Sequence, residues 1–191
     1  MIDKMTTTVQ EALGQAQQVA ITRHHQAIDI PHLWLIFTQD DHFAGKIYQD
    51  LGIRLADFRQ KIEGEIDKIS EVTGSNVTYG QQLSSRLNQL ISDASAIAEE
   101  FQDQYIATEV LLLALYNQKN NPLTQYLLEN GLDEATLKER IKVLRGGESV
   151  TSQNQEETYE SLAKYAKNLN EAVKNNELDP VIGRDEEIRD V

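Results

Sequence analysis

One stretch of sequence occurs twice in this chain, and it decides the fold. Residues 6–23 read TTTVQEALGQAQQVAITR, and residues 84–101, 78 positions later, read SSRLNQLISDASAIAEEF. Both place apolar side chains at the same relative positions, namely Val9, Ala12, Leu13, Ala16, Val19 and Ala20 in the first and Leu87, Leu90, Ile91, Ala94, Ile97 and Ala98 in the second. This spacing puts the apolar side chains on one face of a helix, so two copies of a helical unit are expected.

The similarity continues outward from these two stretches. The segments LWLIF and LGI in the first copy correspond to LLLAL and NGL in the second, at residues 33–37 and 51–53 and at residues 111–115 and 130–132. One inserted residue raises the offset from 78 to 79 between the two segments. Two repeats are therefore expected, at about residues 1–78 and 79–146.

Capping signals divide each repeat into short helices. Thr8 and Glu11 fit a capping box at the start of a helix that runs to about Arg23. Pro31 suits a first helical position, and Thr108 is expected to supply a hydroxyl cap at the equivalent start in the second repeat.

Glycine and aspartate mark further helix boundaries. Gly52 and Gly131 are expected to end short helices, and Asp133 is expected to cap a last helix over residues 134–144. No stretch shows sustained strand alternation. The expected fold class is therefore all-α, with two pseudo-symmetric multi-helix repeats.

The composition argues against several classes of protein. The 18 basic and 31 acidic side chains give a formal net charge of −13, which repels phosphate backbones, so no nucleic-acid partner is expected. The lack of cysteine excludes disulfides and cysteine-ligated zinc and permits a reducing cytoplasm. The longest apolar run, residues 110–116, is far shorter than the roughly 18 residues that a membrane span needs, so no membrane association is expected.

Small and polar residues follow the second repeat. Residues 147–157 contain one apolar side chain, Val150, and are expected to form a flexible linker. Residues 158–191 open with a helical pattern of apolar side chains that only the preceding domain could cover. We therefore expect them to be the truncated start of another domain.

Motifs for catalysis and metal binding are missing from the sequence. A phosphate-binding P-loop needs G-x-x-x-x-G-K-[ST], but Asp40 stands at the first glycine position and Ile47 follows the lysine. The four histidines lack a zinc-binding spacing, and His25 and His32 are interpreted as packed or surface residues. The chain is expected to be neither an enzyme nor a metal protein.

A few positions at which the repeats differ point to binding. Asp103 is expected in a loop and Glu109 in the first turn of a helix, both near the surface, while Val110 need not face the core. Together with Thr6, these residues could line a cleft between the repeats and offer apolar area and hydrogen-bond acceptors to an extended peptide. The alternative is structural, because helix capping explains Thr6 and Glu109, and Asp103 could be an ordinary loop residue.

The end of the chain resembles a known family. Residues 178–189, LDPVIGRDEEIR, are similar to the opening of the first AAA+ module of Clp-type unfoldases, and the double repeat resembles the Clp N-terminal domain. HQAIDIPHLW at residues 25–34 and RGGE at residues 145–148 are most similar to the ClpB-type disaggregases of the Clp ATPase family. The ClpC-type unfoldases, which serve proteolysis, are the nearest alternative.

The resemblance implies a function. ClpB-type proteins are ring-forming, hexameric cytoplasmic ATPases that use ATP and Mg²⁺ to pull polypeptides out of aggregates together with the DnaK chaperone system. Their N-terminal domain binds unfolded or aggregated polypeptides in an apolar groove. The family's groove positions fall on Thr6, Asp103 and Glu109, with Val110 as a candidate apolar contact. The adenine-contacting stretch of the family falls on Val181, Ile182 and Gly183.

This sequence stops before the Walker motifs, the pore loops and the middle domain of that family. The chain is therefore expected to be a monomeric piece of a longer protein, without ATPase activity or a cofactor of its own. In the ClpC alternative, the same domain would dock one folded adaptor protein.

Overall fold

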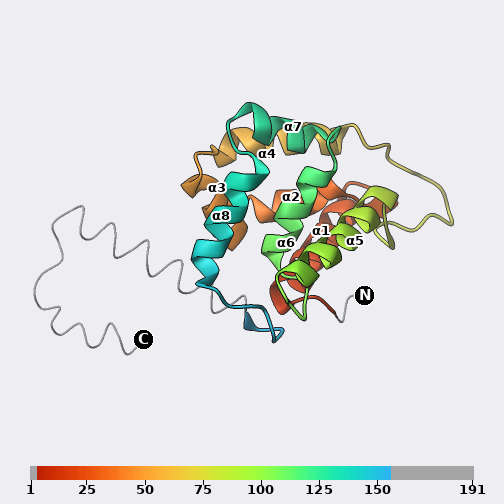
Figure 1. Ribbon diagram of the computed structural model, residues 1–191. Coiled ribbons are helices and arrows are strands. Elements are labelled where there is room, and N and C mark those ends of the chain that lie inside the picture. Colours follow the sequence, from red (N-terminus) through yellow and green to blue (C-terminus); the bar gives the residue numbers. More distant parts are fainter. Residues whose placement is uncertain (1–3, 156–191) are drawn as a thin grey trace, which may run out of the picture. The chain divides into compact units, whose positions relative to one another are not determined.

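The structure, a computed structural model, describes residues 4–155 of the chain. The first repeat forms α1 (Thr7–Thr22), α2 (Ile30–Phe37), α3 (Phe43–Asp50) and α4 (Leu55–Asp67). The second forms α5 (Ser85–Glu100), α6 (Thr108–Ala114), the short 3-10 helix η2 (Leu115–Asn117), α7 (Pro122–Glu129) and α8 (Glu134–Arg145). Figure 1 shows this helical arrangement, which confirms the predicted all-α class.

The repeated helical face is buried as the spacing predicts. In α1 and in α5, five of the six matched apolar positions are buried, and the sixth, Val19 or Ile97, is half-buried in both. The loops after these helices also correspond, because His24 and Gln102 both adopt a φ of 60°. For residues other than glycine this conformation is uncommon, so its occurrence at equivalent positions supports the duplication.

Two of the predicted helix caps are wrong. Thr6, and not Thr8, caps α1, with its hydroxyl accepting a hydrogen bond from the Val9 amide. The N-cap of α6 is Ala107, so Thr108 lies inside the helix. Both errors shift a cap by one or two residues, because consecutive threonines, or a threonine next to alanine, leave the first helical residue undetermined.

The other predicted caps are confirmed. Asp133 caps α8 by accepting from the Thr136 amide. Pro31 is the second residue of α2 and not the first, because the helix begins at Ile30 after its N-cap Asp29. Gly52 and Gly131 follow α3 and α7 with φ values of 90° and 86°, a conformation that favours glycine.

Apolar side chains of α2 and α6 form the centre of the domain. Trp34 of α2 is fully buried, and its Nε1 donates to the Tyr48 hydroxyl at 2.9 Å. At the end of the domain where α4 and α7 lie side by side (Figure 1), the rings of Phe58 and Tyr126 stack with centroids 5.1 Å apart. One core therefore serves both repeats.

Short extended segments of the two repeats also pair with each other. Strand β1 (Ala27–Ile28) of the first repeat pairs in parallel with β2 (Gln82–Leu83), which precedes α5. The equivalent parallel bridge joins Met5, which precedes α1, to Ile106 of the second repeat. The two bridges are related by the same offset of 78 residues, so the N-terminal segment takes the place of a second β2.

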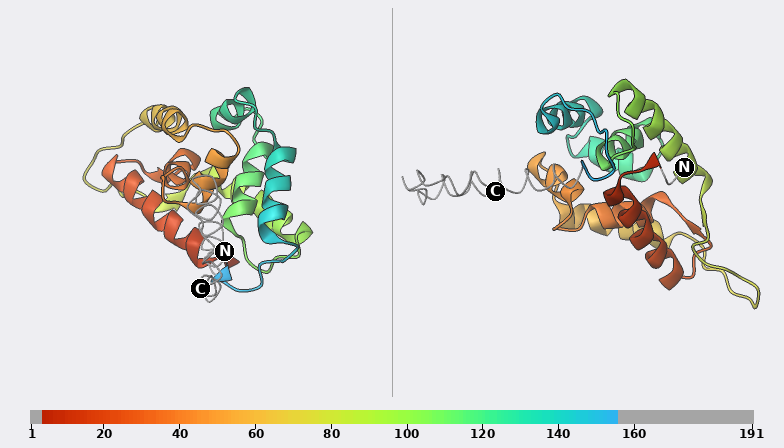
Figure 2. Two further views of the ribbon diagram at one scale, coloured as in Figure 1. Left: turned by 90° about the vertical axis from the view of Figure 1, so that its left-hand side faces the viewer. Right: turned by 90° about the horizontal axis from the view of Figure 1, so that it is seen from below.

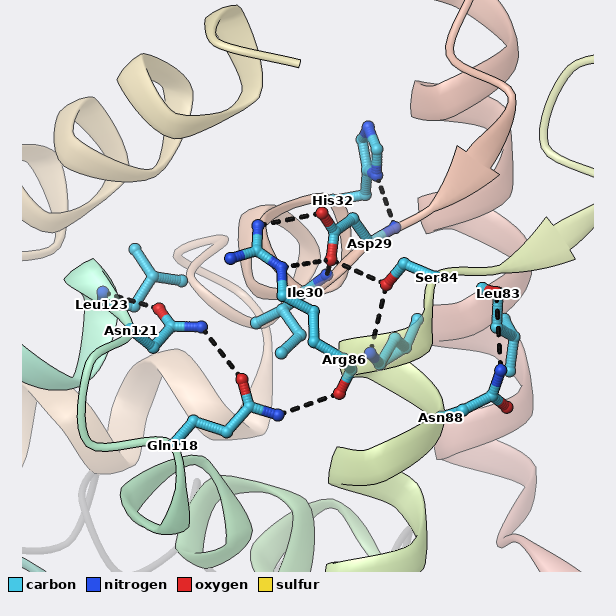
Figure 3. A network of polar contacts seen from close by, with 11 residues as sticks. Asp29, Ile30, His32, Leu83, Ser84, Arg86, Asn88, Gln118, Asn121 and Leu123 are labelled. Carbon is cyan, nitrogen blue, oxygen red and sulfur yellow. Dashed lines mark hydrogen bonds and ion pairs between the residues drawn. The ribbon is translucent and has the colours of Figure 1, made fainter. Parts of the chain in front are cut away.

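A polar network closes the first of these bridges (Figure 3). The Asp29 carboxylate accepts from Arg86 Nε and Nη2 at 2.8 and 2.9 Å and from the Ser84 hydroxyl at 2.8 Å. Burial raises the pKa of Asp29, but the Arg86 guanidinium outweighs that effect and lowers it. The bidentate pair therefore ties the start of α2 to the start of α5.

The compact unit includes the chain up to residue 155, beyond the expected domain end at residue 146. Val150, within the expected linker, is fully buried. Hydrogen bonds to neighbouring loops, more than apolar burial, hold this part of the chain, which is why its polar composition did not predict the contact. The expectations for residues 158–191, with Val181, Ile182 and Gly183, lie outside the described residues. Among the described helices, none has the length and apolarity needed to span a bilayer.

Candidate functional site

Arg145, the last residue of α8, lies between two carboxylates of the second repeat. Its Nη1 donates to Asp103 Oδ1 at 2.8 Å, and its Nη2 and Nε donate to Glu109 Oε1 at 3.0 and 3.1 Å. All three side chains are at most 4% exposed. The expectation that Asp103 and Glu109 lie near the surface is therefore wrong, because a buried guanidinium holds both carboxylates inside the domain.

The charges of this Arg145 cluster are strongly coupled. Burial lowers the pKa of Arg145, but the carboxylates of Glu109 and Asp103 outweigh that effect and raise it, so the guanidinium stays charged. One positive charge faces two carboxylates, and Asp103 Oδ2 and Glu109 Oε2 have no hydrogen-bond partner among the described residues. Both carboxylates therefore depend on the same arginine.

Thr6 and Val110 are also buried. Thr6 is fully buried and caps α1, and its amide donates to Ile106 O at 3.1 Å in the bridge between the repeats. Val110 is 0% exposed, so the expectation that it need not face the core is wrong. The structure thus places all four predicted groove residues beneath the surface, around the junction of α1, α6 and α8.

Residues 148–155, here called the return segment, pass over this junction from the end of α8 to the start of α1 (Figure 2). The Val150 amide donates to Asp103 Oδ1 at 2.9 Å, and Val150 O accepts from the Gln104 amide at 2.7 Å. Further along, Gln153 O accepts from the Thr7 amide at 3.0 Å. The return segment therefore accepts a hydrogen bond from an amide in the first turn of α1 that has no partner inside the helix, and it covers the loop that carries Asp103.

An apolar pocket of about 340 Å³ opens beside the start of α1. Its lining combines one face of α1 with the segments that bridge the repeats, and consists of Met5, Gln10, Leu13, Gly14, Gln17, Ile28 and Leu83. Gln10 and Gln17 are the polar residues of the lining, and Gln10 Nε2 donates to Met5 O at 2.9 Å. A methionine in such a lining adapts to side chains of different shapes.

Gly14 is unusual within this pocket. It lies in the middle of α1, where glycine is less favourable than alanine by roughly 1 kcal/mol. A Cβ built on Gly14 would meet nothing within 4 Å, so packing inside the domain does not require a glycine there. Helix stability would favour alanine at this position, so we attribute the glycine to its place in the wall of the pocket.

His25 and His32 form a buried pair in the first repeat. His32 Nε2 lies 2.9 Å from His25 Nδ1, and His32 Nδ1 accepts from the Asp29 amide. This arrangement assigns the proton of neutral His32 to Nε2, which donates to His25. Burial, followed by the repulsion of His25, lowers the pKa of His32 to about 4. Within residues 4–155, no three His, Cys, Asp or Glu side chains are grouped as metal ligands.

The sequence patterns predict neither Arg145 nor the pocket. At the offset of 79 that pairs Phe58 with Leu137, Arg145 corresponds to Ile66, and an arginine at an apolar position of the repeat was the available signal. The pocket had one signal, the glycine at position 14 within a helical pattern. Its remaining walls come from segments up to 78 residues apart, which only the fold brings together.

Comparison with known proteins identifies relatives of this chain. Residues 4–130 match the family described as Clp repeat (R) N-terminal domain. The chain is 57% identical over 190 residues to the Chaperone protein ClpB of Lactococcus lactis subsp. cremoris (strain MG1363), a match that covers 100% of this chain and 22% of that protein. The chain therefore spans about a fifth of the length of this relative.

Solved structures show the same fold. The Hsp104 N-terminal domain from Candida albicans matches with a TM-score of 0.64 at 18% identity, over 78% of this chain and 97% of that one. A structure described as a complex of the ClpV N-domain with a VipB peptide matches with a TM-score of 0.62 at 18% identity, over 78% of this chain and 92% of that one.

Proposed function

Because this chain belongs to the Clp repeat N-terminal domain family, we propose that residues 4–155 capture exposed apolar segments of unfolded or aggregated polypeptides for a ClpB-type chaperone. The observation that carries the proposal is the apolar pocket beside α1, which lies at the junction of the two repeats. Polypeptides bound there are called clients below.

The pocket suits weak and unselective binding. Its lining is mainly apolar, with two glutamines, so a client gains mainly by burying apolar area, at about 25 cal/mol per Å². The N-domain of ClpV, a structural relative, has been solved in complex with a peptide. A small apolar pocket that accepts many sequences fits a domain that collects clients for a larger machine, because a tether raises the effective concentration to about the millimolar range.

The four residues carried over from the family belong to this proposal as neighbours of the pocket. Thr6 follows Met5 directly, and Asp103, Glu109 and Val110 lie across the bridge between the repeats. We propose that they form part of the client-binding region, which a client would reach only if the return segment moved aside.

The whole protein is proposed to resemble its relatives beyond the described residues. It would be a cytoplasmic, hexameric ATPase that uses ATP and Mg²⁺, works with the DnaK system and pulls clients through its ring. In that protein, Val181, Ile182 and Gly183 would contact the adenine. The chain alone would be a monomer that binds clients without hydrolysing ATP.

Filling the pocket tests the proposal. Gly14→Leu places a branched side chain in the pocket without disturbing the core, and Gly64→Leu, at another mid-helix glycine with nothing within 4 Å of its Cβ, is the matched control. Fluorescence anisotropy with a labelled peptide of leucine, phenylalanine and serine measures the affinity. We expect Gly14→Leu to weaken binding about tenfold, a change of about 1.4 kcal/mol, and Gly64→Leu to leave it unchanged.

Two outcomes would contradict this assignment. Equal binding by both variants and the parent chain would place client capture elsewhere on the domain. No binding of the peptide by any of the three, with the folded state confirmed by circular dichroism, would favour the ClpC-like alternative, in which the domain docks one folded adaptor.

A further inference from the structure

The two bridges between the repeats are fastened differently. At the Ile28–Leu83 bridge, the bidentate Arg86–Asp29 pair joins the flanking helices. At the Met5–Ile106 bridge, 78 residues away by the repeat offset, Thr8 and Ala107 occupy the positions of Arg86 and Asp29 and cannot form an ion pair. The second bridge therefore lacks the contact that holds the first.

The return segment stands at this second bridge. Gln153 O accepts from the Thr7 amide, and Gln153 Nε2 donates to Met5 O at 3.3 Å. Its single apolar anchor is Val150, which is buried over the loop of Asp103. Most contacts of the return segment are hydrogen bonds, which water can replace, and Val150 is its one apolar anchor, so its detachment should cost less than the opening of a packed helix.

The return segment and the pocket share an atom. Met5 O accepts from Gln153 Nε2 of the return segment and from Nε2 of Gln10, which lines the pocket. Met5 is itself part of the pocket wall. The contacts of the return segment and the wall of the pocket therefore meet at Met5, so a displacement of Met5 would affect both.

We propose that the return segment, although it does not line the proposed pocket, acts through Met5 as an internal competitor of clients, and that client binding detaches it. The proposal rests on the function proposed above. Detachment uncovers the loop of Asp103 and the start of α1, which adds to the area available to the client. It also frees up to about 3.3–3.6 Å of extended chain per released residue, so the domain gains reach while it holds a client.

The test compares two valines of opposite exposure in the whole chain. Val150→Asp removes the anchor of the return segment, because a carboxylate is not stable at a buried apolar site. Val143→Asp is the matched control, because Val143 is 69% exposed on α8. Val150→Thr, nearly the same shape as valine, is a milder variant that keeps the test valid if the aspartate disturbs folding.

Two measurements are made on each variant. Amide hydrogen exchange of Gln104 and Thr7, whose amides donate to the return segment, reports its attachment. Anisotropy with the labelled leucine, phenylalanine and serine peptide reports client affinity. We expect faster exchange at both amides and about threefold to tenfold tighter binding for Val150→Asp, a smaller change in the same direction for Val150→Thr and no change for Val143→Asp.

The outcomes separate the two proposals. Faster exchange with unchanged peptide affinity would overturn the competitor role while leaving the pocket in place. Rapid hydrogen exchange of both amides in the parent chain would also overturn the competitor role, because the return segment would then not be attached to the domain. If no variant binds the peptide although the amides respond as expected, the proposed client-binding function fails, and the competitor role fails with it.

Discussion

At three equivalent buried positions, the two repeats carry side chains of different chemistry. In the first repeat three such positions hold two neutral histidines and an apolar residue, and in the second they hold an acid, an apolar residue and a base: His25, His32 and Ile66 against Asp103, Val110 and Arg145. All six residues except Asp103 are buried as whole residues, and the Asp103 side chain is 0% exposed. The duplication thus preserves helix geometry and burial while leaving the polar interior free to diverge.

Because of this difference, the two groups of side chains are disrupted by different changes. One hydrogen bond joins the two neutral rings of the histidine pair, so protonation would disrupt the pair. The Arg145 cluster consists of charges that need each other, so loss of one partner is its weakness. It also receives the Val150 amide, which links the second repeat to the return segment.

The largest expected effect comes from removing the charge that both acids of the second repeat share. Arg145→Met leaves Asp103 and Glu109 buried without a counter-charge, and we expect unfolding free energy to fall by about 3–5 kcal/mol, measured by urea denaturation. Arg140→Met, on the same helix, removes a half-exposed arginine 3.6 Å from Asp50 and should cost below about 1 kcal/mol. Similar losses in both variants would contradict the central role of the cluster.

A change of pH probes the first repeat. The pKa of His32 is 6.5 in the unfolded chain and is lowered to about 4 in the fold, so below pH 6.5 the unfolded state takes up protons that the folded state refuses. This stability is complete above pH 6.5 and is lost as the pH falls toward 4. Between pH 6.5 and pH 5, protonation of His32 in the unfolded chain should lower the unfolding free energy by about 1.6 kcal/mol. The capping residue His42, with its pKa also lowered to about 4 by burial, acts in the same direction.

Urea midpoints at the two pH values measure this loss, with His32→Gln as the control. Glutamine keeps a donor and an acceptor but does not titrate, so the variant should lose less stability on acidification than the parent chain. An identical pH dependence in both proteins would show that the histidine pair does not report on folding.

The sequence predicts the architecture well because each repeat carries the same pattern of apolar residues and helix ends. The spacing of apolar residues predicts the buried faces of α1 and α5, and Gly52, Gly131 and Asp133 predict helix ends. These are local patterns of period and backbone conformation, which depend little on distant contacts.

The site is less accessible to such reasoning. Whether Asp103 faces water or a guanidinium depends on Arg145, 42 residues along the chain. Val150 looks like part of a linker because nothing in its neighbourhood reveals the loop that buries it. Long-range polar contacts of this kind follow no periodicity, so local signals assign the residues to the surface when the fold buries them.

The smallest expected effects concern the N-caps of α1 and α5, which occupy equivalent positions in the two repeats. Thr6→Ala should lower the unfolding free energy by about 1 kcal/mol, as expected for loss of a side chain that caps α1. Ser84→Ala should cost slightly more, because its hydroxyl caps α5 and also donates to Asp29 in the first bridge. Thr8→Ala should change stability by less than about 0.5 kcal/mol, because Thr8 lies inside the helix. A loss at Thr8 as large as that at Thr6 would contradict the cap position, and equal losses at Thr6 and Ser84 would show that the Asp29 network does not strengthen the first bridge over the second.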